Sequence, residues 1–270
     1  MNIFQGFFLG LIQGLTEFLP ISSSGHLVLF QKLFDVKKGV MTFDVAVHLA
    51  TLLSVVWIFR EDVIHMIKKP FSKLTLLVVV GTIPAGIIGI VFKDAIEKIF
   101  ESGATLGLEF ILTGIILWFA ETIRSKNKGL DKTTYFDATV VGVAQAIAIL
   151  PAISRSGLTL AGALMRGLNR EFALKLSFLI SMPAILGAAV FDLKDMLKPE
   201  AAAAASLDLW PLLIGMVTAA VSGYFAVKFM LKIFSKTSLK LFSYYVFALG
   251  ALIIIEQIIR GSNSIFGKLF

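Results

Sequence analysis

The chain has 270 residues and a formal net charge of +7, with 16% charged and 57% hydrophobic residues. Soluble domains carry roughly 25% charged residues, so this composition excludes a water-soluble globule, and the lack of cysteine excludes a disulfide scaffold. We therefore expect an all-α polytopic membrane protein. Its excess of Lys and Arg fits cytoplasmic loops. The sequence holds no basic run with interleaved aromatic residues that would indicate a nucleic-acid partner.

The first predicted element is an apolar segment, residues 1–39, that is interrupted midway. The interruption is LPISSSGH at residues 19–26, and a second such segment, residues 136–170, contains LPAISRSG at residues 150–157. Proline removes an amide donor and ends a helix, and bare backbone at membrane depth is tolerated only under protein or beside a water-filled cavity. We expect both segments to form re-entrant helical hairpins.

Uninterrupted apolar runs of about 20 residues, the length that crosses a bilayer, make up much of the remaining chain. Six such runs lie at residues 40–59, 74–92, 105–121, 171–191, 210–227 and 241–259. The predicted fold is therefore six transmembrane helices plus two re-entrant helical hairpins.

Lys and Arg in the short loops indicate the direction of these spans, since they gather on the cytoplasmic side. Loops 60–73, 122–137 and 228–240 hold four such residues each, whereas loops 93–104 and 192–209 hold two each with acidic residues in excess. We expect the first three loops to face the cytoplasm and the other two to face outward. The first hairpin then enters from outside and the second from the cytoplasm.

The two halves of the chain, residues 1–135 and 136–270, resemble each other at an offset that grows from 131 to 136. One recurring feature is a stripe of small residues, formed by Gly81, Ala85 and Gly89 in the first half and by Gly215, Ala219 and Gly223 in the second. Each half holds one hairpin and three spans, and an odd number of spans turns the second half upside down. We predict an inverted-topology repeat that forms one membrane domain, with a binding site where the halves meet.

Ionisable residues within a membrane cost at least about 2.5 kcal/mol each, so those at the interruptions are candidates for function. Glu17 and His26 flank the first interruption, and Arg155 lies in the second, matched by the repeat to Ser23. Amides at helix starts, serine hydroxyls and a guanidinium together suit a phosphate or diphosphate. A carboxylate and an imidazole beside serines add general acid–base and nucleophilic chemistry, which anion binding alone does not need.

These residues also have plainer interpretations, in which Glu17 only neutralises Arg155 and His26 is a satisfied interfacial histidine. Their joint presence in one serine-rich interruption favours chemistry. Asp44 and His48, one helical turn apart, are interpreted as a wet outer rim rather than as a metal or proton site. The neighbouring serines are interpreted as helix caps or phosphate donors rather than nucleophiles, namely Ser22, Ser24, Ser154 and Ser156.

At the two interruptions the chain resembles the bacitracin-resistance family of undecaprenyl-diphosphate phosphatases. QGLTEFLPISSSGH at residues 13–26 is similar to the first signature of that family, and PAISRSGLT at residues 151–159 is similar to the second. The length, the segment plan and the repeat agree over essentially the whole chain. The resemblance implies an enzyme of the bacterial cytoplasmic membrane, with an active site opening outward. It would hydrolyse undecaprenyl diphosphate to the monophosphate and inorganic phosphate, recycling the lipid carrier of cell-wall synthesis and conferring bacitracin resistance.

The resemblance also implies roles for individual residues. The implied catalytic group is Glu17, Ser23, His26 and Arg155, with Ser23 as nucleophile or phosphate contact and Arg155 holding the diphosphate. The predicted substrate-binding residues are Gln13, Ser22, Ser24, Ser154, Ser156 and Thr159. A divalent cation, Mg or Ca, is the implied cofactor, and Glu17 is its candidate ligand because hard cations bind through phosphates plus one or two carboxylates.

The alternative function is a lipid-phosphate flippase or an anion transporter, since broken helices in inverted repeats are also typical of transporters. The Glu–Ser–His cluster beside the Arg favours the enzyme, because translocation does not require it. The sequence leaves open whether serine or water attacks the phosphate, and whether the chain forms a homodimer.

Overall fold

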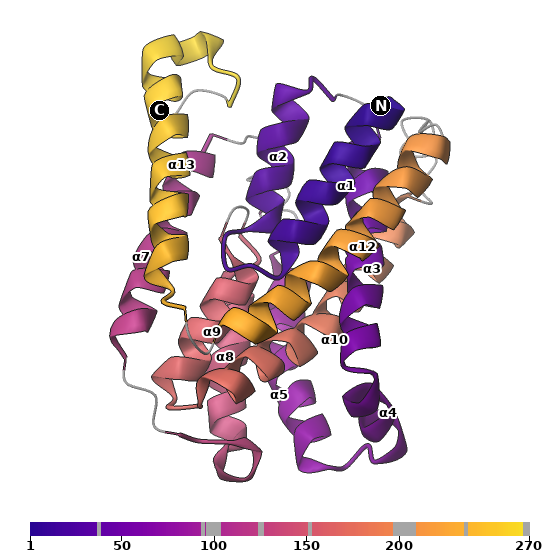
Figure 1. Cartoon of the computed structure of the whole chain (residues 1–270), viewed down its shortest axis with the longest axis vertical. Coiled ribbons are helices and arrows are strands. Elements are labelled where there is room, and N and C mark those ends of the chain that lie inside the picture. The colour runs from indigo at the N-terminus through magenta and orange to yellow at the C-terminus, as the bar shows by residue number, and fades with distance from the viewer. Residues whose placement is uncertain are drawn as a thin grey trace.

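A computed structural model describes residues 1–36, 39–92, 95, 104–123, 127–150, 153–196, 209–234 and 237–266. Within these residues every regular element is helical, with 11 α-helices and two short 3-10 helices, so the all-α prediction is confirmed (Figure 1). The α-helices are α1 (Ile3–Glu17), α2 (Ser23–Leu33), α3 (Val40–Ile58), α4 (Arg60–Lys68), α5 (Lys73–Val91), α7 (Leu106–Thr122), α8 (Tyr135–Ile147), α9 (Arg155–Met165), α10 (Arg170–Met196), α12 (Leu209–Ile233) and α13 (Lys240–Arg260). The 3-10 helices are η1 (Leu130–Lys132) and η2 (Gly261–Asn263).

Five helices within the described residues, α3, α5, α10, α12 and α13, are long and apolar enough to cross a membrane. They match five of the six predicted crossings. Their outer faces expose large apolar side chains that a water-soluble protein would bury, such as Trp57 at 64% and Phe225 at 61%. The chain is therefore an integral membrane protein. The sixth predicted crossing, residues 105–121, corresponds to α7, whose 17 described residues extend over about 25 Å.

Both interrupted segments form pairs of helices. The first segment gives α1 and α2, and the second gives α8 and α9, with each break at the predicted place. Figure 1 shows α1 and α2 side by side above α8 and α9. The first turn of α9 reaches the loop between α1 and α2, where the Ser156 hydroxyl donates a hydrogen bond of 2.8 Å to the Leu19 carbonyl.

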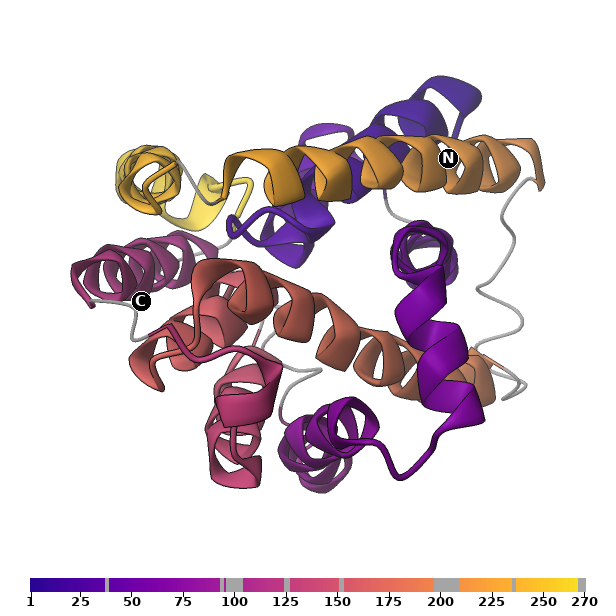
Figure 2. The same ribbon diagram turned by 60° about the horizontal axis from the view of Figure 1, so that its bottom comes forward.

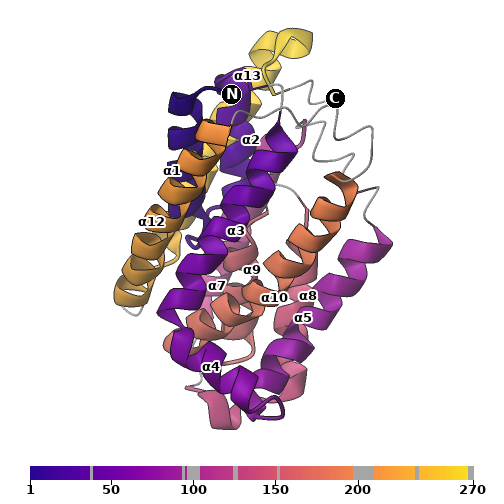
Figure 3. The same cartoon turned by 90° about the vertical axis from the view of Figure 1, so that its right-hand side faces the viewer.

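Each helix pair packs against a helix from the other half of the chain. Helix α1 lies along α12, and α8 lies along α5 (Figures 2 and 3). Glycines allow these close approaches, because a Cβ on Gly10 would come within 3.0 Å of the Gly215 carbonyl oxygen. A Cβ on Gly142 would meet the Gly81 carbonyl in the same way. The stripe of small residues noted in the sequence thus forms part of two helix contacts between the halves.

The main apolar core contains side chains from both halves. It includes Phe18 from the end of α1, Leu77 of α5 and Phe110 of α7, together with Phe178 of α10 and Met230 of α12. Phe18 and Phe178 pack edge to face, with ring centroids 5.5 Å apart. Because the core also includes apolar side chains of α9, it packs on both helix pairs.

Candidate active site

A buried carboxylate, Glu17, is the centre of a polar cluster that joins the two interruptions. Its side chain is 2% exposed, and its Oε1 accepts a hydrogen bond from the Arg155 guanidinium. Its Oε2 accepts hydrogen bonds from the Ser23 hydroxyl at 2.5 Å and from the Gln13 amide at 2.9 Å. Four of the residues predicted from the two signatures therefore lie in direct contact.

Helix ends place these side chains. Glu17 is the last residue of α1, Ser23 is the first of α2 and Arg155 is the first of α9. Gln13 lies one turn before Glu17, so the two side chains share one face of α1. The starts of α2 and α9 both lie at the cluster, and such helix N-termini favour anions through their free amides and dipoles.

The cap residues of α2 and α9 hold the two interruptions in the same way. The hydroxyls of Ser22 and Ser154 accept a hydrogen bond from the amide three residues later, at 3.2 and 3.1 Å. The hydroxyls of Ser24 and Ser156 lie 3.4 and 3.3 Å from these cap hydroxyls. Ser22 has a φ of +70°, which a non-glycine residue adopts only under constraint, and such residues gather at functional sites.

Thr159, predicted to bind substrate, lies one turn beyond Arg155 on α9 and is 1% exposed. Its hydroxyl contacts the Arg155 carbonyl at 2.8 Å and the Ser177 hydroxyl at 2.5 Å. These contacts fix the start of α9 against α10. Thr159 is thus bonded to the backbone of the first turn of α9, which begins with Arg155.

His26, predicted to act beside Glu17, hydrogen-bonds elsewhere in the described structure. Its Nδ1 lies 2.6 Å from the Ser22 carbonyl oxygen, and its Nε2 lies 2.8 Å from the Tyr245 hydroxyl. Because a carbonyl only accepts, Nδ1 carries a proton, while Nε2 shares a hydrogen bond with the Tyr245 hydroxyl. Tyr245 also stacks on the ring. The sequence gave no indication of this contact, because Tyr245 of α13 is one aromatic residue in an apolar span.

The imidazole that reaches Glu17 belongs to His48 on α3. Its Nε2 lies 3.6 Å from Glu17 Oε2, and its Nδ1 lies 2.7 Å from the carbonyl oxygen of Asp44. The interpretation of this pair as an outer rim did not place His48 beside Glu17, whereas the structure brings its part-exposed side chain to the cluster. The usable signal was an ionisable side chain within a predicted span, the same criterion that identified Glu17.

A resident metal fits this cluster poorly. Among the residues that the structure describes, no group of three or more His, Cys, Asp or Glu side chains is arranged to hold an ion. Both oxygens of Glu17, the predicted ligand, already accept hydrogen bonds. The Arg155 guanidinium beside it would also repel a dication.

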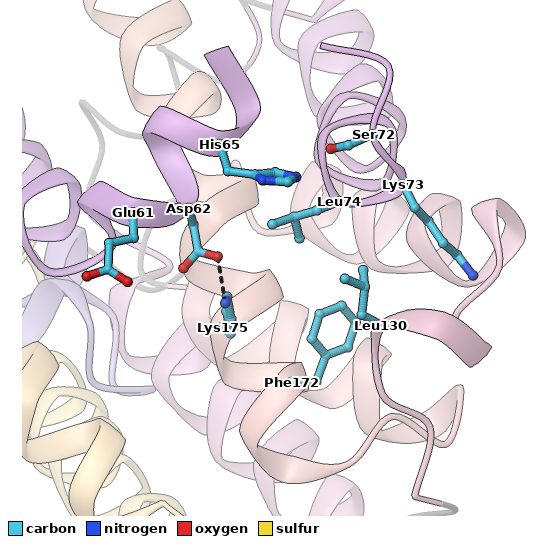
Figure 4. A pocket seen from close by; sticks show the side chains of 9 residues that line it. All are labelled: Glu61, Asp62, His65, Ser72, Lys73, Leu74, Leu130, Phe172 and Lys175. Atoms are coloured by element: carbon cyan, nitrogen blue, oxygen red, sulfur yellow. Dashed lines mark ion pairs between the residues drawn. The ribbon is translucent and has the colours of Figure 1, made fainter. Parts of the chain in front are cut away.

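A separate cavity of about 380 Å³ lies between α4, α5 and α10. Figure 4 shows Asp62 pointing toward Lys175, with which it forms an ion pair of 2.7 Å, and His65 on the side toward Ser72. None of the predicted site residues lines this cavity. The cluster around Glu17 is therefore the candidate active site.

Comparison with known proteins covers nearly the whole chain. Residues 6–252 match the family described as "Bacitracin resistance protein BacA". The undecaprenyl-diphosphatase of Carboxydothermus hydrogenoformans is 58% identical over 257 residues, which cover 95% of this chain and 98% of that protein. Undecaprenyl-diphosphatase 3 of Bacillus cereus is 46% identical, covering 96% of this chain and 99% of that protein. The undecaprenyl-diphosphatase of Halothermothrix orenii is also 46% identical, covering 94% and 98%.

The matched region includes both interruptions and every residue of the cluster around Glu17. The resemblance seen in the two signatures thus extends over residues 6–252. On this evidence, the chain belongs to the bacitracin resistance protein family.

Proposed function

We propose that this protein hydrolyses undecaprenyl diphosphate to undecaprenyl phosphate and inorganic phosphate at the cluster around Glu17. Membership of the family and the names of near-full-length relatives support the substrate. The observation that carries the site is the contact between a guanidinium from the second interruption and a carboxylate from the first. Through this activity the protein recycles the lipid carrier of cell-wall synthesis and confers resistance to bacitracin.

The reaction uses groups that already touch. The Ser23 hydroxyl donates to Glu17 Oε2, so this carboxylate is placed to accept the proton as an oxygen nucleophile forms. Arg155 is part-exposed and binds the diphosphate, offsetting charge on the terminal phosphoryl group in the transition state. The amides at the starts of α2 and α9 add further donors.

Two routes for bond cleavage use this arrangement. In one, Ser23 Oγ attacks the terminal phosphorus, undecaprenyl phosphate leaves, and water then cleaves the phosphoserine. In the other, Glu17 activates a water held near Ser23, and that water attacks directly. A trapped phosphoserine in the wild type would favour the first route, whereas slow hydrolysis by the variant Ser23→Ala would favour the second.

The proposed architecture has six crossings, with α7 as the sixth, and two re-entrant hairpins, α1–α2 and α8–α9, in an inverted repeat. The caps Ser22 and Ser154 support it, because they lie 132 positions apart and make the same hydrogen bond. The packing of each hairpin on a helix from the other half supports it as well. In this arrangement the polyprenyl tail lies in lipid between helices while the diphosphate enters the polar cluster.

We place the protein in the bacterial inner membrane, with the direction of its spans taken from the Lys and Arg loops and the cluster opening outward as the family resemblance implies. Because the residues around Glu17 fit a resident metal poorly, the divalent cation, Mg or Ca, is proposed to arrive on the diphosphate oxygens. A homodimer stays a prediction.

The decisive experiment incubates the purified protein in detergent with a C55 or C15 isoprenyl diphosphate and measures free phosphate with Mg, with Ca and with a chelator. We expect phosphate release in at least one cation condition. No release in any condition would contradict the enzyme and favour the alternative, a lipid-phosphate flippase or anion transporter. Lipid movement in sealed vesicles would then be the next measurement.

A further inference from the structure

The net charge of the cluster around Glu17 affects how it can bind a diphosphate. Arg155, the predicted diphosphate ligand, is already paired with Glu17, so together these two residues carry no net charge. A diphosphate is strongly anionic, and proteins bind such groups through several charge-assisted hydrogen bonds. A further cationic donor at the cluster would therefore strengthen binding, in addition to the helix N-termini and to any cation carried by the diphosphate.

His48 lies where such a donor is required. Its Nδ1 faces the Asp44 carbonyl oxygen at 2.7 Å, and its Nε2 faces Glu17 Oε2 at 3.6 Å. The Nδ1–H donates to the Asp44 carbonyl, and a diphosphate oxygen at Nε2 would be a second acceptor, so a ring with an N–H on each side suits the bound state. In that bound state His48, Arg155 and Glu17 together would carry a charge of +1.

The Nε2 position is also open to a ligand. The 3.6 Å separation exceeds a normal N–H···O hydrogen bond, so the N–H is not committed to Glu17. The side chain of His48 is 29% exposed and that of Arg155 is 22% exposed, whereas that of Glu17 is 2% exposed. The imidazole and the guanidinium therefore form an accessible rim above the buried carboxylate.

His26 is not placed to do the same. It is 2% exposed, and its two ring nitrogens contact the Ser22 carbonyl and the Tyr245 hydroxyl. Of the two imidazoles near the first interruption, only that of His48 has a nitrogen facing both the carboxylate and open space.

We propose that His48 binds the diphosphate through Nε2 and supplies the positive charge that the Arg155–Glu17 pair cancels. This inference rests on the proposed function for the identity of the anion. In the bound state the Nε2–H donates to a phosphate oxygen while Nδ1 stays on the Asp44 carbonyl. The imidazole ring of His48 faces Glu17 of α1 and the carbonyl of Asp44 on α3. Glu17 in turn contacts Arg155 of α9.

Two substitutions separate binding from packing. His48→Asn places an amide nitrogen near Nδ1, so it keeps the bond to Asp44 and removes the donor at Nε2. His48→Gln places an amide nitrogen near Nε2, so it keeps a neutral donor there. The matched control is His65→Ala, an exposed histidine of α4 that lines the separate cavity shown in Figure 4.

The measurements are KM and kcat for phosphate release from a C15 isoprenyl diphosphate, and the affinity of each purified protein for inorganic pyrophosphate by calorimetry. We expect His48→Asn to raise KM and weaken pyrophosphate binding on the order of tenfold to a hundredfold, as for loss of a hydrogen bond to a charged group. His48→Gln should fall between His48→Asn and the wild type. The control should match the wild type.

Wild-type KM and pyrophosphate affinity in His48→Asn would overturn the proposal. Equal losses in both variants, together with a lowered melting temperature, would indicate a packing role and overturn it as well. The two proposals fail separately. If the wild type releases no phosphate, the proposed function fails, whereas a loss of pyrophosphate binding in His48→Asn would still support an anion site at His48.

Discussion

The two hairpins share one backbone plan but carry different chemistry. Their caps Ser22 and Ser154 lie 132 positions apart, and so do the capping boxes at the starts of α1 and α8, which begin at Asn2 and Thr134. Each hairpin also packs on a small-residue face of the other half. The framework of the site is therefore present twice.

At the same offset the functional side chains differ. Glu17 in the first hairpin corresponds to Ile149 in the second, and Ser23 corresponds to Arg155. The first hairpin thus carries the groups that handle a proton, and the second carries the cation. Because each hairpin lacks what the other supplies, the proposed reaction requires both.

The bases of the hairpins differ as well. In the first hairpin the Gln5 amide donates to the Phe34 carbonyl at 2.9 Å. At the corresponding positions of the second, the Asp137 carboxylate pairs with Arg166 at 2.7 Å, and Lys128 adds a contact of 3.2 Å. Ion pairs therefore close the second hairpin at the end that we predict to be cytoplasmic, whereas a neutral hydrogen bond closes the first.

The largest effect is expected from removing the cation of the second hairpin. Arg155→Ala should abolish turnover and weaken substrate binding, because Glu17 then keeps an uncompensated charge where the diphosphate must lie. Arg155→Lys keeps the charge but loses the two-pronged geometry, so we expect partial activity. Phosphate release from a C15 isoprenyl diphosphate measures both. If Arg155→Ala released phosphate at the wild-type rate, the reaction would not need the cation of the second hairpin.

Removing the proton acceptor of the first hairpin should come next. Glu17→Gln is expected to lower kcat on the order of a hundredfold or more, as general-base losses do, with substrate affinity largely kept. The amide keeps the shape of the side chain, so the melting temperature serves as a check on folding. The matched control is Ile149→Leu, at the corresponding position of the second hairpin, which should leave kcat unchanged. Normal turnover by Glu17→Gln would reduce Glu17 to a structural counter-ion of Arg155.

The sequence predicted much of this arrangement, because membrane insertion leaves strong local signals. Long apolar runs identified the spanning helices, and proline with serine identified both interruptions. The contact between Glu17 and Arg155 was also predictable, since ionisable groups inside a membrane need partners. These features follow from the cost of placing polar groups in a hydrocarbon layer.

The partners of the two histidines were not predictable. His26 and His48 both lie near the first interruption, and spacing along a helix does not show which of them faces a carboxylate on another helix. Tyr245, which binds His26, comes from the far end of the chain. Such choices depend on how helices rotate as they pack, and this rotation is fixed by small residues and ring contacts spread over both halves.

The helix contacts between the halves give a third prediction. Gly10→Ala and Gly142→Ala should each destabilise the protein by about 1–3 kcal/mol, because the added methyl would meet a backbone carbonyl of the partner helix. Gly86→Ala is the control, since a Cβ there meets nothing within 4 Å. The melting temperature in detergent measures all three variants. Equal stability of the three would show that these close approaches contribute little to joining the halves.

The smallest effect is expected from Tyr245→Phe, which tests what the first hairpin gains from having His26 where the second has Leu158. The substitution removes the hydroxyl that hydrogen-bonds with His26 Nε2 but keeps the aromatic ring that stacks on the imidazole. A neutral hydrogen bond contributes about 1 kcal/mol, so we expect kcat to change by no more than about fivefold, with the melting temperature lowered slightly. If kcat instead fell as far as in Glu17→Gln, the Tyr245–His26 pair would belong to the reacting group, and the first hairpin would hold two proton-handling centres.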